Sequence, residues 1–383
     1  MQTRLFTPGP TPVPAELSLA MAHPMPHHRT PEFQAIMQRT TALLQQIYRT
    51  DDPVIILTSS GTGAMEAAVV NLTHPGEKAL AIDAGKFGER WGNLLQTYGR
   101  DARILKVEWG GSPDPAQVKK EVQEHGARAI FMTHSETSTG ALADLESIAR
   151  VARELDVLLV VDAITSLGAH KVETKAWGLD CVISGSQKAF MLPPGLAFLS
   201  LSERARARLE GNPTPRFYFD LVKALKLAPQ GQSPWTPAIT LVMGLEAACQ
   251  RILAEGLEKV WERHQILGEA TRTGLRAMGL QLLAARPSNA VTAAYVPEDV
   301  GADTLRNMLF ERYGIKIAGG QDQLKGKIIR VGHLGAYDAS DITLFLTATE
   351  ALLRKQGTPI RAGAALGAAG PVLARFFDTG GVS

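Results

Sequence analysis

Cysteine is scarce in this sequence. The 383 residues include only Cys181 and Cys249, and no C-x-x-C pair occurs. This excludes a disulfide framework and a zinc ribbon, and it predicts a reducing, cytoplasmic compartment. His23, His27 and His28 lie close together but lack the carboxylate or cysteine spacing of a metal site, so no metal is expected.

The sequence also has no large excess of positive or negative charge. Lys and Arg number 40, Asp and Glu number 38, and the net charge is +2, so binding to nucleic acid or to a membrane surface is not expected. No apolar run reaches the roughly 20 residues of a membrane-spanning helix. Residues 1–10 reach Pro-Gly-Pro before the apolar core of a signal peptide can form. This balance is typical of a globular enzyme with two domains.

Several catalytic signatures are absent as well. The sequence contains no H-E-x-x-H, G-x-S-x-G or S-x-x-K motif, which removes the zinc-protease, hydrolase and β-lactamase hypotheses. Gly326-Lys327 lacks the rest of a P-loop. After Gly61-Thr62-Gly63, Glu66 stands where a dinucleotide fingerprint has its third glycine, so a Rossmann-type cofactor is disfavoured.

What is present is a regular alternation of short apolar runs and amphipathic stretches. The apolar runs predict buried strands over residues 54–57, 78–82, 129–132, 157–161, 181–183 and 197–201. The amphipathic stretches predict helices over residues 64–72, 89–98, 115–124 and 145–155. This alternation predicts an α/β fold with a largely parallel sheet that helices cover on both faces.

The remaining residues predict a smaller α+β domain. A long helical pattern over residues 238–263 leads to expected strands at 280–284, 291–296 and 327–331 and to expected helices at 303–313 and 340–355. We divide the chain into four parts: a proline-rich, extended N-terminal arm (1–20), a large domain (21–255), a small C-terminal domain (256–357) and a Gly- and Ala-rich, loosely packed tail (358–383).

Three polar groups follow predicted strands. Residues 59–64, Ser-Ser-Gly-Thr-Gly-Ala, open a helix where free N–H groups bind phosphate, although an ordinary helix cap has the same composition. Asp162 stands at the end of one predicted strand. A carboxylate at this place either caps a helix or faces a ligand. Lys188 follows the next predicted strand. On position alone it is either a functional group at the same sheet edge or a solvated surface lysine. Together, a lysine, a carboxylate and a phosphate cradle are what a pyridoxal 5'-phosphate site requires.

Six segments in order along the chain carry a specific resemblance. They are Thr7-Pro8-Gly9-Pro10-Thr11-Pro12-Val13-Pro14, Ser60-Gly61-Thr62-Gly63, His134-Ser135-Glu136-Thr137-Ser138-Thr139-Gly140, Val161-Asp162-Ala163-Ile164-Thr165-Ser166-Leu167-Gly168, Gly185-Ser186-Gln187-Lys188-Ala189 and Arg330-Val331-Gly332. The chain resembles the class V, fold type I pyridoxal-phosphate aminotransferases, in the branch that uses alanine or serine with glyoxylate or pyruvate. The resemblance implies a large domain with a mostly parallel, seven-stranded sheet and a smaller C-terminal α+β domain.

The resemblance also implies roles for individual residues. Lys188 matches the lysine that forms a Schiff base with pyridoxal 5'-phosphate, and Asp162 matches the carboxylate on the pyridinium nitrogen. The other cofactor-binding positions are Ser60, Gly61, Thr62 and Gln187 for the phosphate, Thr137 near the ring oxygen, Phe87 against the ring, and Thr236, which matches a segment that reaches the partner subunit's cofactor. Relatives often have Trp at the position of Phe87, and some have a Tyr upstream of Thr236 that this chain lacks.

Arg330 and Gly9 bear on the substrate. A planar guanidinium suits a carboxylate, which amino acids and keto acids both carry, and the apolar neighbours of Arg330 argue against a solvated surface arginine. The Pro8-Gly9-Pro10 segment resembles an arm that closes over the pocket and favours small side chains. The sequence thus predicts a homodimeric aminotransferase that moves an amino group from alanine or serine to glyoxylate or pyruvate by a ping-pong cycle.

Three alternatives keep the same fold. A phosphoserine or phosphonate aminotransferase needs additional cations, for which Arg216 and Lys223 are candidates. A cysteine desulfurase needs a mobile cysteine in a C-terminal-domain loop, and neither cysteine lies there. A non-catalytic accessory subunit is expected to have lost Lys188, Asp162 or Arg330, and all three are present.

Overall fold

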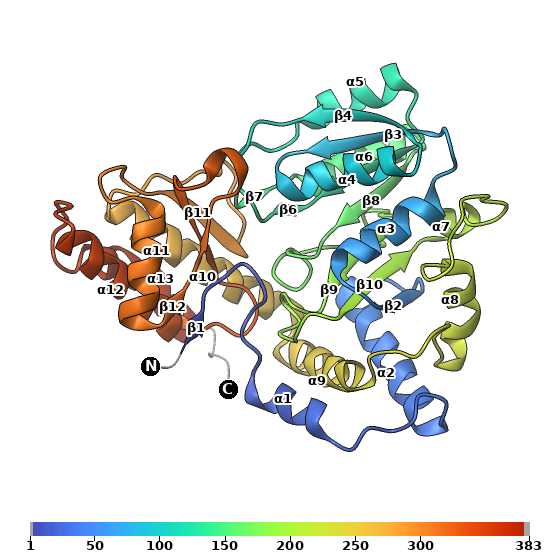
Figure 1. Cartoon of the computed structure of the whole chain (residues 1–383), viewed down its shortest axis with the longest axis horizontal. Helices are drawn as coiled ribbons and strands as arrows, with labels where there is room; N and C mark the ends of the chain where they lie inside the picture. The colour runs from blue at the N-terminus through green and yellow to red at the C-terminus, as the bar shows by residue number, and fades with distance from the viewer. Residues whose placement is uncertain (1–2, 379–383) are drawn as a thin grey trace.

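A seven-stranded sheet forms the centre of the larger part of the molecule (Figure 1). The computed structural model describes residues 3–378. The strand order is β2-β10-β9-β8-β5-β3-β4, in which β10 is antiparallel to both neighbours and the other pairs are parallel. The strands are β2 (Val54–Thr58), β3 (Lys78–Asp83), β4 (Asp101–Lys106), β5 (Ala129–Thr133), β8 (Leu158–Asp162), β9 (Cys181–Gly185) and β10 (Leu196–Leu201). The predicted α/β fold is confirmed, and β4 is a strand that the apolar pattern did not indicate because it is only partly buried.

Helices cover both faces of this sheet, as the unbroken apolar strands require. One face packs against α1 (Ala15–Ala22), α2 (Pro31–Tyr48), α5 (Pro115–His125), α6 (Leu145–Glu154) and α9 (Ile239–Glu255). The other packs against α3 (Gly61–Leu72), α4 (Lys86–Thr97), α7 (Glu203–Ala207) and α8 (Leu221–Leu227). Thr30, Asp114 and Asp144 accept backbone N–H groups at the starts of α2, α5 and α6, so the local sequence fixes where these helices begin.

The C-terminal part has its own core around an antiparallel sheet of order β11-β14-β13. Its elements are α10 (Leu257–Ala277), β11 (Val291–Tyr295), α11 (Ala302–Tyr313), β12 (Ile315–Lys316), β13 (Ala318–Gly319), β14 (Ile328–Gly332), α12 (Ala339–Lys355) and α13 (Ala364–Asp378). Short elements elsewhere are β1 (Arg4–Leu5), β6 (Ser135–Glu136), β7 (Ala141–Leu142), η1 (Ala228–Gln230) and η2 (Asp322–Leu324). Leu257 and Val260 of α10 pack in the large core and Ile266 in the C-terminal core, so we propose α10 as the element that the two domains share.

Four sequence expectations need correction. The helical pattern over 238–263 is two helices, because the chain breaks at Gly256, whose φ is +88°. Residues 280–284 form no strand; Leu282 makes only an isolated bridge to Ala294. The arm is not extended throughout, because α1 lies within it.

The fourth correction concerns the tail. Residues 358–383 were expected to be loosely packed, yet α13 buries Ala365, Ala369, Leu373 and Phe376 in the C-terminal core and packs along α10. Small side chains allow this close helix contact although they give a weak periodic pattern. Residues 379–383 of the predicted tail lie outside the described residues. No helix within residues 3–378 is both long and apolar enough to cross a membrane.

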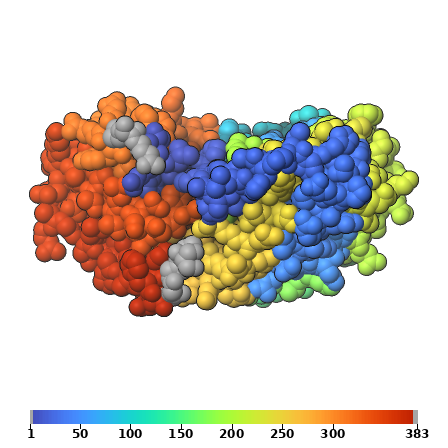
Figure 2. Space-filling model, turned by 90° about the horizontal axis from the view of Figure 1, so that it is seen from below, coloured from blue at the N-terminus to red at the C-terminus, as the bar shows by residue number. Residues whose placement is uncertain are grey.

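The N-terminal arm connects the two parts of the molecule. Figure 2 shows this segment, in blue, lying across the orange C-terminal part and continuing over the yellow segment that contains α9. Phe6 is fully buried against Tyr337 and Phe345, and β1 pairs with β12. Further on, Thr11 donates its hydroxyl to the carbonyl of Lys188 at 2.8 Å. The arm therefore passes directly over the lysine on which the functional hypothesis rests.

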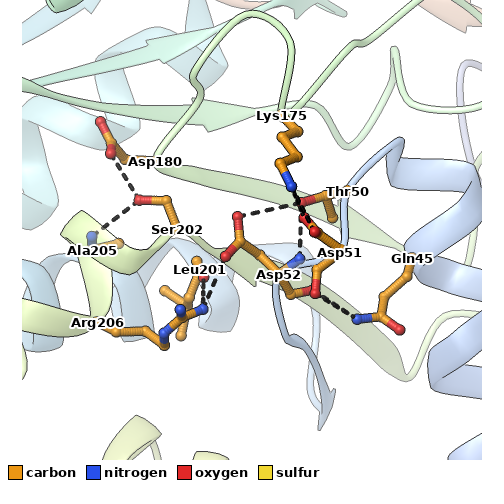
Figure 3. A network of polar contacts seen from close by, with 10 residues as sticks. All are labelled: Gln45, Thr50, Asp51, Asp52, Lys175, Asp180, Leu201, Ser202, Ala205 and Arg206. Carbon is orange, nitrogen blue, oxygen red and sulfur yellow. Dashed lines mark hydrogen bonds and ion pairs between the residues drawn. The ribbon is translucent and has the colours of Figure 1, made fainter.

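A polar network closes the edge of the sheet at which β2 and β9 begin (Figure 3). Asp52 pairs with Arg206 at 3.0 Å, and Ser202 donates to Asp180 at 2.8 Å. Lys175 binds the exposed Asp51 nearby. Because parallel strands end at the opposite edge, these charges stabilise the ends of the sheet away from the predicted site and leave the carboxyl edge for function.

Candidate active site

A cavity of about 260 Å³ lies at the carboxyl edge of the large sheet. Strands β2, β5, β8 and β9 all end there, so their following residues converge on one space. The residues that line it are Gly9, Pro10, Ser60, Gly61, Thr62, Phe87, Arg90, Thr133, Ser135, Thr137, Asp162, Ile164, Thr165, Gln187, Lys188 and Pro194. Nine of the eleven site residues predicted from sequence are in this set; Arg330 and Thr236 are not.

Lys188 is a buried lysine without an ion-pair partner among the described residues, and its side chain is 8% exposed. Its Nζ donates to the carbonyl oxygen of Pro8 at 2.6 Å. Burial lowers the pKa of Lys188 to about 8, and Arg330 lowers it as well, while Asp162 and Glu136 oppose the shift. The neutral, nucleophilic amine is therefore far more abundant near neutral pH than it is for an ordinary lysine.

Asp162 ends β8 and is 3% exposed. Its Oδ1 accepts the backbone N–H of Ile164 at 2.9 Å. Burial raises the pKa of Asp162 to about 6, although the Ile164 N–H and the charges of Lys188 and Arg90 act in the opposite direction. The carboxyl group thus remains mostly charged at pH 7 and faces the cavity without an ion-pair partner in the described part of the chain.

The start of α3 provides unpaired N–H groups. Ser60 is the N-cap, yet its side chain makes no capping hydrogen bond, and the first backbone bonds of the helix begin at Gly63. The N–H groups of Gly61 and Thr62 are therefore free to bind an anion. A Cβ on Gly61 would lie 2.3 Å from Cδ1 of Ile164, so a larger residue here would displace that side chain.

Two side chains from α4 form another wall of the cavity. Phe87 is half-buried, and the guanidinium of Arg90 lies 5.0 Å from the centre of its ring. Arg90 also donates to the hydroxyl of Thr62 at 2.8 Å. The Phe87 ring is thus in contact with Arg90, which is itself hydrogen-bonded to Thr62 of α3. A ring held in this way can stack on a flat ligand.

Arg330 stands behind Thr137 rather than in the cavity wall. Its Nη1 donates to the Thr137 carbonyl at 3.0 Å and its Nε to the Gly319 carbonyl at 2.8 Å. No carboxylate of the described residues forms an ion pair with this guanidinium, which is 8% exposed. The hydroxyl of Thr137 meets that of Thr165 at 2.7 Å.

The comparisons with known proteins agree with this geometry. Residues 15–342 match the family described as Aminotransferase class-V. The chain belongs to the class V aminotransferases. It is 36% identical to the L-aspartate–glyoxylate aminotransferase of Paracoccus denitrificans over 379 residues, covering 96% of this chain and 95% of the relative. The serine–glyoxylate aminotransferase of Hyphomicrobium methylovorum is 35% identical, with coverages of 95% and 93%.

The chain is also similar to a protein with a different kind of name. The small subunit of a soluble hydrogenase from Synechococcus sp. is 43% identical to this chain, with 96% of this chain and 98% of that protein covered. Among solved structures, an aspartate aminotransferase of subgroup IV from Thermus thermophilus superposes with a TM-score of 0.87 at 38% identity, covering 92% of this chain and 99% of that one. These matches confirm the predicted family and its fold type I architecture.

The family implies pyridoxal 5'-phosphate, and the cavity of this class V aminotransferase fits that group. Oε1 of Gln187 and Oγ1 of Thr133 are buried in the wall without a hydrogen-bond partner, which a polar ligand would remedy. The free N–H groups of Gly61 and Thr62 suit a phosphate, and the buried carboxylate of Asp162 suits a protonated ring nitrogen.

Two side chains that hold the site together, Arg90 and Glu136, were not among the predicted residues, and Thr236, which was predicted, lies away from the cavity. Arg90 lies three positions after Phe87, on the same side of a helix, a spacing that was available as a signal. Glu136 was quoted only as part of a motif, yet its buried carboxylate binds the start of α4. Thr236 is exposed beside Trp235 and lines a different depression of its own chain.

Proposed function

We propose that this class V aminotransferase binds pyridoxal 5'-phosphate in the cavity and transfers an amino group from a small amino acid, alanine or serine, to glyoxylate or pyruvate. The observation that carries the proposal is the pairing of a buried lysine with a buried aspartate across one cavity, neither of them in an ion pair with the other. Burying two such charges is costly unless a ligand uses them.

The chain's own groups divide the work. When bound, pyridoxal 5'-phosphate supplies an electron sink and a carrier for the amino group. Ser60, Gly61, Thr62 and Gln187 would hold its phosphate, and Phe87 and Thr137 its ring. Asp162 would keep the ring nitrogen protonated. Lys188 would be the base that moves the proton at the substrate Cα, because its lowered pKa, about 8, brings its titration closer to neutral pH than that of an ordinary lysine.

Substrate choice rests on Arg330 and the arm. The guanidinium of Arg330, which forms no ion pair within residues 3–378, would bind the carboxylate that both substrates share. The backbone of Pro8 and Gly9 closes directly on Lys188: a Cβ on Gly9 would lie 2.8 Å from its Nζ. This close approach favours donors with small side chains. Relatives that carry aspartate in their names make aspartate the competing donor to test.

Two alternatives with the same fold lose support from the side-chain positions. Arg216 donates to the carbonyls of Asn212 and Thr214, and Lys223 lies over Phe217 and Trp235, so neither candidate cation for a phosphorylated substrate lines the cavity. The two cysteines are buried, in β9 and in α9, which argues against a mobile desulfurase nucleophile.

We also propose a homodimer in which Thr236 reaches the partner's site. Thr236 is exposed, and the adjacent Trp235 stacks on Phe217, of which 72% is exposed. An exposed apolar surface of this kind suits contact with a second copy of the chain. Two free, buried cysteines support a cytoplasmic location.

The test uses purified protein with added pyridoxal 5'-phosphate. We expect a visible absorption band that alanine or serine bleaches and glyoxylate restores, with pyruvate or hydroxypyruvate formed. Lys188→Ala should bind the cofactor without that band and should lose turnover. A wild-type protein that develops no band, or a band that no amino acid changes, would refute the proposal and favour an accessory subunit, as the name of the hydrogenase-subunit relative suggests.

A further inference from the structure

Glu136 is a buried carboxylate that the proposed chemistry does not use. It lies in β6, is 2% exposed, and forms no ion pair among the described residues. Four hydrogen bonds reach it instead: from the N–H groups of Phe87 at 3.2 Å and Gly88 at 3.0 Å, and from the N–H and hydroxyl of Ser138 at 3.1 and 2.6 Å. Two of these donors are N–H groups in the first turn of α4, where backbone N–H groups have no partner within the helix.

The backbone before α4 is shaped around this carboxylate. A Cβ on Gly85 would lie 2.7 Å from Cγ and 2.8 Å from Cδ of Glu136. The N–H of Lys86 is bound by the hydroxyl of Ser138 at 3.1 Å. The side chain of Glu136 in β6 therefore packs closely against the start of α4 and hydrogen-bonds to it.

Both sides of this junction carry site residues. On the α4 side, Glu136 holds the backbone of Phe87, whose ring faces the cavity. On the β6 side, the next residue is Thr137, whose hydroxyl binds Thr165 and whose carbonyl accepts Nη1 of Arg330. A shift of β6 would therefore move the acceptor that orients Arg330.

We infer that Glu136 is a positioning residue that joins Phe87 to Thr137, and through Thr137 to Arg330, so that the cofactor ring and the substrate carboxylate are held in fixed relation. The inference rests on the proposed function and adds to it a residue that touches neither ligand. The structural alternative is that Glu136 serves only to cap α4 and stabilises the fold.

The charge of Glu136 provides one readout, and KM provides the readout that a mere cap would not move. The charged side chains that act on Lys188 are Asp162 of β8, Arg330 of β14 and Glu136 itself. The Glu136 carboxylate raises the pKa of Lys188 and that of Asp162. Removing that charge should therefore lower the pKa of both groups, in the same direction.

The experiment compares Glu136→Gln, Glu136→Asp and Glu350→Gln. Glu350 is a matched control because its buried carboxylate also binds N–H groups at a helix start, those of Gly363 and Ala365 at α13. The first readout is the rate at which cofactor-free protein develops the visible band with pyridoxal 5'-phosphate, followed from pH 6 to 10. The second is KM and kcat with alanine and glyoxylate.

We expect Glu136→Gln to shift the midpoint of the loading rate to lower pH and to raise KM for alanine roughly 10-fold, since a charged hydrogen-bond acceptor is lost. Glu136→Asp keeps the charge but shortens the side chain, so it should raise KM and leave the midpoint in place. This variant also tests the geometry if Glu136→Gln fails to fold. Glu350→Gln should lower Tm and change neither readout.

Two negative results have different meanings. If wild type loads normally but the Glu136 variants match Glu350→Gln in both midpoint and KM, Glu136 is only a cap and this inference is wrong. If wild type develops no band, the proposed function fails and the inference fails with it.

Discussion

Replacing Gly9 with alanine brings a methyl group against the lysine that the arm covers. The new Cβ would lie 2.8 Å from Cε, 2.8 Å from Nζ and 2.9 Å from Cδ of Lys188. Ordinary carbon contacts are about 3.5–4.0 Å, so the lysine or the arm must move. The φ of Gly9, +146°, is also one that other residues rarely adopt, at a cost of about 1–3 kcal/mol.

The backbone part of this cost lowers stability, whereas the contact with Lys188 should lower activity. The overlapping atoms are the end of a flexible side chain, so displacing Lys188 from the carbonyl of Pro8 is easier than unfolding the arm. A misplacement worth about 1–3 kcal/mol in the transition state lowers kcat/KM roughly 5- to 150-fold. We expect a loss in that range with alanine and glyoxylate, together with the fall in Tm that the backbone penalty causes.

Gly279→Ala is the control for this experiment. Gly279 has a φ of +84° and no atom within 4 Å of its added Cβ, so it carries a backbone penalty without a contact to the lysine. It should lose stability by about 1 kcal/mol and keep its kcat/KM. If Gly9→Ala keeps the full kcat/KM of wild type, the arm does not position Lys188 and the reasoning is wrong.

Four further outcomes follow from the site and its supports. Because burial lowers the pKa of Lys188 to about 8, the loading rate with pyridoxal 5'-phosphate should rise with pH up to about pH 8 and then level off. A loading rate that keeps rising toward pH 10.5, the usual lysine pKa, would contradict this. Asp162→Asn should keep the cofactor bound, as dialysis can show, and lower kcat roughly 10²- to 10⁴-fold. Arg330→Lys should raise KM for alanine about 10-fold with a smaller effect on kcat, because the planar fork is lost; an unchanged KM would remove Arg330 from the substrate site. Leu373→Ala should destabilise α13 packing by about 2–5 kcal/mol in urea unfolding without changing kcat of the folded enzyme.

Where the sequence interpretation succeeded, it relied on one-dimensional patterns with strong physical causes. Strands β5, β8 and β9 are buried on both faces, so their residues form unbroken apolar runs. Asp162 and Lys188 follow such runs, and parallel strands bring their carboxyl ends to one edge, so the proximity of these residues was predictable.

It failed where packing rather than pattern decides the structure. Strand β4 is at the sheet edge and partly exposed, so it shows no apolar run. Helix α13 packs through alanines, whose small side chains give little contrast between its buried and exposed faces. The break at Gly256 was readable in principle, since a glycine inside a long helical pattern marks a possible end.

The residues missed at the site share one property: each acts through contacts between segments distant in sequence. Arg90 is defined by its contact with Thr62, 28 positions away, and Glu136 by its contacts with Phe87 and Gly88, 49 and 48 positions away. A motif shows which residues stand next to each other in the chain, whereas a positioning residue is recognised by what it holds together. For this reason the sequence could predict nine of the residues that line the cavity, whereas the groups that hold them in place required the fold.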